Sequence, residues 1–172
     1  MKTYKFKVEV PEVNNGKSSL LDSFINEARD EQRQLDITHR INKKTTKVHR
    51  QILIDFITEI NEELSSIGFN EFKLSDELGH GNNYYYDSVA KLQVPYNYNL
   101  SRKSYKLYIV GENERKFEDS KYTTYTGKYR FGLSTPSAPS TYERVKTVDD
   151  VLTILKDEII EHIKKNREIV AS

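Results

Sequence analysis

The chain has 172 residues, with 27 basic and 26 acidic side chains, a formal net charge of +1 and no cysteine. This length suits one domain with a core of its own, and 36% hydrophobic with 31% charged residues excludes collagen-like, low-complexity and membrane-spanning classes. The lack of cysteine excludes disulfides, thiolate nucleophiles and cysteine metal sites. We therefore expect a single globular domain over residues 1–172 that does not span a membrane.

The composition also suggests a source and a location. Lysine, isoleucine, asparagine and tyrosine together account for 56 residues, a skew that AT-rich codons produce. We therefore expect the genome of a low-GC bacterium, its phage or a mobile element. The first residues contain no apolar run of signal-peptide length, so the expected location is the cytoplasm or a virion.

The N-terminal part of the chain predicts a strand followed by a helix. Apolar and polar residues alternate over residues 2–10, which indicates a half-buried strand. Ser19 and Asp22 then form a capping-box pattern ahead of apolar residues at helical spacing. A first helix is therefore predicted over about residues 19–34.

A polar stretch separates this helix from a second one. Residues 30–46 contain few large apolar side chains, which leaves three alternatives open: a continuation of the helix, a mobile loop or an arm. Helical spacing then returns from Val48 to Ile67. The sequence predicts Thr45 or Thr46 as the N-cap of the second helix, and Gly68 as its left-handed C-cap.

After Gly68 the apolar period changes towards two, in a region rich in tyrosine and threonine, which predicts a sheet. Residues 79–83 and 111–114 are typical of turns and favour an antiparallel meander. Four strands are predicted, over residues 69–74, 86–94, 105–109 and 125–133. On the second of these, one face is assigned to Tyr86, Ser88, Ala90, Leu92 and Val94.

The C-terminal part predicts a loop and a last helix. Residues 134–140 contain two prolines and are expected to form the loop. Thr147 and Asp150 match a capping box before an amphipathic segment. The predicted fold is therefore α+β: a two-layer sandwich in which two or three helices cover one face of an antiparallel meander of four or five strands.

Basic residues and tyrosines gather in the predicted sheet. Residues 84–146 contain 11 basic and 6 acidic side chains and 11 of the 12 tyrosines. Cations that follow phosphates and rings that stack on bases are typical of surfaces for single-stranded nucleic acid, although solvated sheet faces are also commonly rich in lysine. Alternation assigns to the open sheet face the candidate residues Lys91, Lys106, Tyr108, Lys128 and Arg130.

A second basic cluster lies between Ile37 and Ile54, where the chain has no acidic residue. Its members recur every three or four residues, so on a helix they would share one stripe that could contact successive phosphates. His39 and His49 would add charge at mildly acidic pH. The alternative is a solvated surface. The candidate residues are Arg40, Lys43, Lys44, Lys47 and Arg50.

Motifs for catalysis are missing. The chain has no glycine-rich phosphate loop, nucleophile elbow or dinucleotide fingerprint, so we expect a non-enzymatic protein without a cofactor. Four oxygen or imidazole side chains fall within twelve residues and could hold a divalent cation, but nothing in their spacing fixes a geometry, and no metal site is assigned. They are Asp76, Glu77, His80 and Asp87.

Together these observations favour a small accessory protein that binds single-stranded DNA or RNA through the basic sheet face and the basic helical stripe. The alternative is a protein-binding or structural subunit of a phage or mobile element, such as a virion component or an inhibitor of a host factor. The composition and near-neutral charge fit both hypotheses. An exposed tyrosine-rich sheet would equally suit a protein partner or a second copy of the chain.

Overall fold

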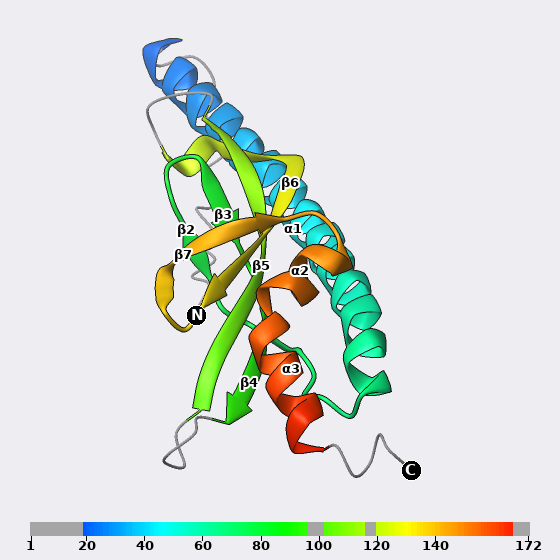
Figure 1. Cartoon of the computed structure of the whole chain (residues 1–172). Coiled ribbons are helices and arrows are strands. Elements are labelled where there is room, and N and C mark those ends of the chain that lie inside the picture. Colours follow the sequence, from blue (N-terminus) through cyan, green and yellow to red (C-terminus); the bar gives the residue numbers. More distant parts are fainter. Residues whose placement is uncertain (1–18, 96–101, 116–119, 167–172) are drawn as a thin grey trace.

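A computed structural model describes residues 19–95, 102–115 and 120–166. Within these ranges, three helices cover one face of a seven-stranded antiparallel sheet, which confirms the α+β prediction (Figure 1). The strand predicted over residues 2–10 lies outside the described residues. In chain order the elements are α1 (Ser19–Ser66), β1 (Lys73–Ser75), β2 (Gly79–His80), β3 (Tyr84–Tyr86), β4 (Val89–Pro95), β5 (Arg102–Arg115), the 3₁₀ helix η1 (Ser120–Tyr122), β6 (Thr123–Thr135), β7 (Ala138–Val145), α2 (Val148–Ile154) and α3 (Lys156–Lys165).

The long strand β5 is the centre of the sheet. One edge of β5 pairs first with β4 and then, further along, with β3, while its other edge pairs with β6. Outside these strands, β1 adds to β4, β2 adds to β3 and β7 adds to β6. The sequence pattern did not separate the short strands β1, β2 and β3, which have only two or three residues each.

Helix α1 is continuous over 48 residues, so the polar stretch 30–46 is part of a helix. The prediction of an N-cap at Thr45 or Thr46 is wrong, because both hydroxyls donate to carbonyls of the preceding turn inside the helix. The predicted end is confirmed. Gly68 has a φ of +66°, and the N–H groups of Gly68 and Phe69 donate back to Ser65 and Leu64 in a Schellman arrangement.

The core lies between the sheet and the second half of α1, joined by α2 and the turn into α3. On each central strand, alternate residues point into it, because side chains of a strand alternate between faces. The core residues with no exposed surface include Leu53 and Ile60 of α1, Leu92 and Leu107 of the sheet, and Leu155 between α2 and α3.

Three local predictions require correction. The segment 111–114, predicted as a turn, lies within β5, where the pairing with β6 shifts register between Gly111 and Asn113. Gly111 lies against the ring of Tyr85, where a Cβ would collide. The predicted loop 134–140 is a tight β6–β7 hairpin in which Thr135 pairs with Ala138. The predicted last helix divides at Leu155, although the capping box of Thr147 and Asp150 at its start is confirmed.

Tyr86 also departs from its predicted face. Ala90, Leu92 and Val94 point into the core as expected. Tyr86 instead packs in a small cluster on the opposite side of the sheet. The strand is interrupted between β3, which ends at Tyr86, and β4, which begins at Val89, so the alternation of faces restarts there. The other members of this cluster are Val89, Tyr108 and Val110.

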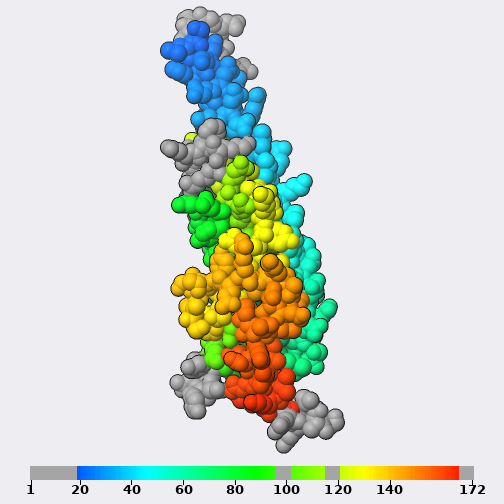
Figure 2. Space-filling model, turned by 45° about the horizontal axis from the view of Figure 1, so that its top comes forward, coloured from blue at the N-terminus to red at the C-terminus, as the bar shows by residue number. Residues whose placement is uncertain are grey.

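The first half of α1 extends beyond the sheet as an arm (Figure 2). Between Ser19 and Ile41 no side chain is buried, although several are large and apolar. None of the helices in the described ranges combines the length and the apolar character that crossing a bilayer requires.

Candidate nucleic-acid interface

Two polar side chains attach the middle of α1 to β6. The Asn42 amide group donates to the carbonyl of Thr123 at 3.0 Å, and its oxygen accepts from the N–H of Tyr125 at 2.9 Å. Two turns later, Nε2 of His49 lies 3.1 Å from the carbonyl oxygen of Gly127. These bonds fix the rotation of α1, and so decide which flank of the helix faces the β2–β3 hairpin.

A buried aromatic group lies behind this attachment. The Tyr85 hydroxyl is 2.9 Å from Nδ1 of His49, and the Tyr85 ring stacks on Tyr125 with centroids 3.5 Å apart. Because the carbonyl of Gly127 can only accept, Nε2 of His49 carries the proton and Nδ1 accepts from the tyrosine. Burial raises the pKa of Tyr85 well above its usual range and that of Tyr125 to about 12, so both hydroxyls stay protonated.

A groove of about 450 Å³ lies between the middle of α1 and the β2–β3 hairpin, and we call it the helix–hairpin groove. This volume is within the range of ligand-binding clefts. The helix supplies most of its polar lining, and the sheet supplies the rest. It is lined by His39, Asn42, Lys43, Thr46, Lys47 and Arg50 from α1, and by Leu78, His80, Asp87 and Tyr125.

The five cations predicted to share a helical stripe do so, and all five are exposed. Lys43, Lys47 and Arg50 line the helix–hairpin groove. Arg50 forms an ion pair with Asp76, whereas none of the other four has an ion pair among the residues that the structure describes. We call Arg40, Lys43, Lys44, Lys47 and Arg50 the basic stripe.

Among the described residues, Asp87 supplies the one carboxylate of the groove's lining. It follows β3, and its Oδ2 atom is buried without a hydrogen-bond partner in the described part of the chain. Burial raises the pKa of this carboxyl, while the nearby His80 and His49 act in the opposite direction. A buried acceptor atom without a partner among the described residues thus belongs to a side chain that lines the same groove as Lys43, Lys47 and Arg50.

The predicted sheet-face cluster is less cationic than its sequence suggests. Lys91 and Lys106 both form ion pairs with Glu77, and the Lys106–Glu77 distance is 3.5 Å. The hydrogen bond from Lys91, together with the charges of both lysines, holds the pKa of the Glu77 carboxyl below its usual value. Tyr108 is only 9% exposed.

The remaining two members of this cluster lie on β6. Arg130 donates to the Tyr142 hydroxyl at 2.7 Å and lies over its ring, and Lys128 is exposed.

The structure does not bring the two predicted basic clusters together. The basic stripe belongs to the helical layer, whereas Lys91 and Lys106 point away from that layer because their neighbours Ala90 and Leu107 are in the core. The β1–β2 connection lies between the clusters: Asp76 pairs with the stripe, and the next residue, Glu77, pairs with the sheet face.

The four candidate metal ligands do not form a site. Within the described residues, no group of three or more histidines and carboxylates is arranged to hold a metal ion. Asp76 and Glu77 are engaged in ion pairs with Arg50 and Lys91, and only His80 and Asp87 line the helix–hairpin groove.

Sequence reasoning missed the residues that hold the groove together. His49 was assigned to the charged surface, but it is 4% exposed and both of its ring nitrogens are bonded. A signal for its burial was present, because His49 lies one helical turn before Leu53 on the stripe that faces the core.

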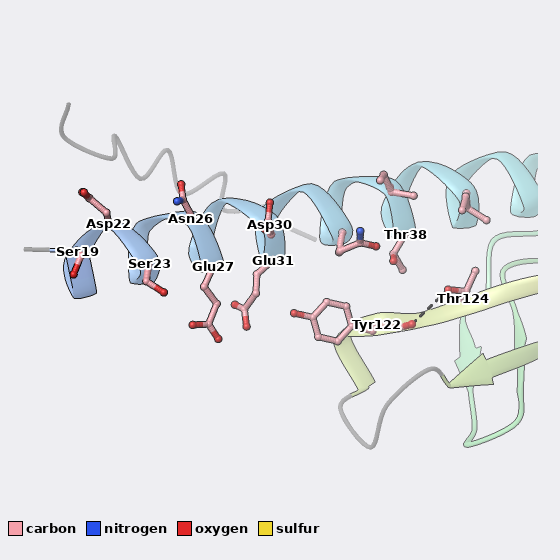
Figure 3. Close-up of a pocket in the computed structure, with 13 residues that line it drawn as sticks. Ser19, Asp22, Ser23, Asn26, Glu27, Asp30, Glu31, Thr38, Tyr122 and Thr124 are labelled. Atoms are coloured by element: carbon pink, nitrogen blue, oxygen red, sulfur yellow. Dashed lines mark hydrogen bonds between the residues drawn. The ribbon is translucent and has the colours of Figure 1, made fainter. Parts of the chain in front are cut away.

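A larger groove of about 1060 Å³ follows the arm of α1 and ends at Tyr122 (Figure 3). Its lining is acidic, with Asp22, Glu27, Asp30 and Glu31 along successive turns. In Figure 3, the Glu27 and Glu31 side chains extend to the side of the helix on which Tyr122 lies. Carboxylates repel phosphates, so this groove does not extend the basic surface.

Comparison with known proteins gives no match to a family model, to a curated protein or to a solved structure.

Proposed function

We propose that this protein binds single-stranded nucleic acid along the basic stripe of α1 and the adjoining helix–hairpin groove. The observation that carries the proposal is the set of four exposed cations without ion-pair partners in the described structure, arranged on one flank of a helix that Asn42 and His49 fix to the sheet. The stripe runs for about 15 Å, at 1.5 Å per helical residue, and so offers successive phosphates a rigid row of charges.

The groove beside the stripe adds surfaces for bases. His80 and Tyr125 line it from the hairpin and from β6, and Leu78 adds an apolar side chain. Stacking of a base on an aromatic side chain contributes about 1–3 kcal/mol and tolerates any sequence. Phosphates would follow the lysines while bases enter the groove. The sheet-face residues have a smaller part in this proposal, because Glu77 offsets Lys91 and Lys106.

The test is fluorescence anisotropy with labelled 15-nucleotide DNA and RNA single strands and a matched duplex, titrated between 50 and 300 mM salt. The Lys43→Glu/Lys47→Glu variant should weaken single-strand binding at least tenfold and reduce the salt slope by about 1.4, since each phosphate contact contributes about 0.7. Lys156→Glu/Lys164→Glu, on exposed positions of α3, is the control with the same charge change. Absence of binding at 50 mM salt, or equal losses in both variants, would overturn the proposal.

One observation favours a second candidate function, the recognition of a protein partner. The arm of α1 exposes Leu20, Leu21 and Phe24 at 62%, 56% and 55% of their surface. Exposed large apolar side chains that adjoin one another are typical of interaction surfaces. Native mass spectrometry of the chain with and without the substitutions Leu20→Ser and Phe24→Ser tests this candidate: a complex that the variant loses supports it, and a monomer in both cases argues against self-association.

A further inference from the structure

A second cavity lies on the face of the sheet opposite the helices, and we call it the tyrosine pocket. Its volume is about 240 Å³. Clefts that hold drug-sized ligands are larger, so this pocket suits one small flat group. Four of its lining residues are tyrosines: Tyr84 and Tyr86 of β3, Tyr108 of β5 and Tyr142 of β7.

The strands hold three of these rings in place. Each ring lies against a glycine, at a position where a Cβ would collide with it. The pairs are Tyr86 with Gly79, Tyr84 with Gly81 and Tyr142 with Gly132. The rings are thus positioned, while Tyr84 and Tyr142 keep 43% and 37% of their surface exposed. Positioned and partly exposed rings are the surfaces on which the bases of a single strand stack.

Two arginines lie beside the tyrosine pocket on the same face of the sheet. Arg144 is in one row with Tyr108 across the strands, and Arg130 is opposite Val110, two residues further along β5. Both arginines point away from the helices, because the residue that follows each of them packs in or against the core. Neither has an ion pair within the described residues. Guanidinium groups are well suited to binding phosphate.

The tyrosine pocket and the helix–hairpin groove lie on the two faces of the β2–β3 hairpin. Tyr85 points to His49 and the helical layer, whereas its neighbours Tyr84 and Tyr86 line the pocket. In the described part of the chain, β2 is the last strand on that side of the sheet. The route from one site to the other therefore leads around this edge.

From this we infer that the tyrosine pocket is a second contact of the proposed interface and takes one base of a bound single strand. The base stacks on Tyr84 or Tyr142, while the two arginines bind the neighbouring phosphates. A quaternary ammonium group also suits aromatic rings, but the charge of the arginines disfavours a cation. This inference rests on the proposed function and extends its site to the other face of the sheet.

The first test is photocrosslinking of the wild-type protein to 15-nucleotide deoxythymidine strands that carry one 5-iodouracil at varied positions. Mass spectrometry of the crosslinked peptides should identify Tyr84 or Tyr142. The second test is fluorescence anisotropy with the same strand. Tyr84→Leu/Tyr142→Leu should weaken binding at least fivefold, because leucine keeps the apolar bulk but offers no ring.

Tyr129→Leu is the control, because Tyr129 is 46% exposed and lines neither the tyrosine pocket nor the helix–hairpin groove. It should change the affinity by less than twofold. Circular dichroism and a thermal melt confirm that each variant is folded, and the crosslinking result does not depend on any variant.

The outcomes separate this inference from the proposed function. Binding that Lys43→Glu/Lys47→Glu weakens, but that gives no crosslink in the tyrosine pocket or is unchanged in Tyr84→Leu/Tyr142→Leu, would overturn the inference and leave the proposed function standing. A dimer in native mass spectrometry that the same leucine variant abolishes would assign the pocket to a second copy of the chain and also overturn it. Absence of binding to any single strand would overturn both.

Discussion

Tyr85 and His49 form a hydrogen bond of 2.9 Å between the phenolic oxygen and Nδ1, and their exposed fractions are only 2% and 4%. The bond joins a three-residue strand to the middle of a long helix, and Nε2 of the same histidine reaches Gly127 on β6. One imidazole thus holds three elements together behind the helix–hairpin groove. The geometry of the groove depends on this buried pair.

Tyr85→Phe should destabilise the protein by about 1–3 kcal/mol, because it leaves the buried Nδ1 of His49 without a donor. Urea denaturation followed by circular dichroism measures the loss. Tyr84→Phe makes the same change at the neighbouring residue, which is 43% exposed, and should alter the free energy of unfolding by less than about 0.5 kcal/mol. Equal effects of the two substitutions would show that the hydrogen bond is unimportant.

Gly111→Ala should also be destabilising, by roughly 1–3 kcal/mol, because a Cβ at this position would overlap the ring of Tyr85. The ring is buried and cannot move without losing its bond to His49. Gly132→Ala is the informative comparison: it faces the ring of Tyr142, which is 37% exposed and can turn aside. The melting temperature of Gly111→Ala should therefore be the lower of the two, and the reverse order would contradict this account.

Asp87→Asn should stabilise the protein at pH 7. Burial holds the pKa of Asp87 above its ordinary value of 3.8, so folding with an ionised carboxylate is unfavourable wherever the group is charged in both states. As the pH falls through the raised pKa towards and below 3.8, the group becomes protonated in both states and the gain disappears. Free energies of unfolding at pH 7 and pH 3 test this, and a gain of equal size at both would refute it.

Glu77→Gln should destabilise the protein at pH 7, the opposite of the effect expected for Asp87→Asn. The hydrogen bond from Lys91 lowers the pKa of Glu77 below 4.5, so its stabilising contribution is present above that pH and is lost as the pH falls through the lowered value. The carboxylate is 31% exposed, and we therefore expect a loss of less than about 1 kcal/mol at pH 7 and a smaller loss at pH 3. Because the ion pairs are near the surface, 1 M salt should reduce the loss at pH 7, and an undiminished loss would argue against an electrostatic origin.

Features that depend on neighbouring residues could be predicted from the sequence. Gly68 ends α1 and Thr147 begins α2 because the bonds that form these caps join residues at most five positions apart. The basic stripe follows from the spacing of its lysines and arginines once the segment is taken as a helix. The continuity of α1 could not be predicted, because residues 30–46 have no apolar period and are helical through backbone bonding and through the attachment at Asn42.

The groove itself lay beyond sequence reasoning for a different reason. The partners of His49 are 36 and 78 positions away along the chain, so no local pattern relates them. Gly111 was predicted as part of a turn because glycine is common in turns, whereas here it makes room for the ring of Tyr85. In both cases, the role of the residue follows from a contact with a residue distant in sequence: His49 with Tyr85 and Gly127, and Gly111 with Tyr85.

Only the second half of α1 is attached to the sheet, so we expect the protection of its backbone amides from hydrogen exchange to differ between its two halves. From Ser19 to Ile41 no side chain is buried, so these amides can exchange their hydrogens with water by fraying of successive turns. From Asn42 onward, opening the turns that carry Asn42 and His49 also breaks bonds to the sheet, so we expect slower exchange there. The transition between the two regimes falls inside the basic stripe, so a nucleic acid bound to Arg40 and Lys43 would slow exchange on the unprotected side of that boundary.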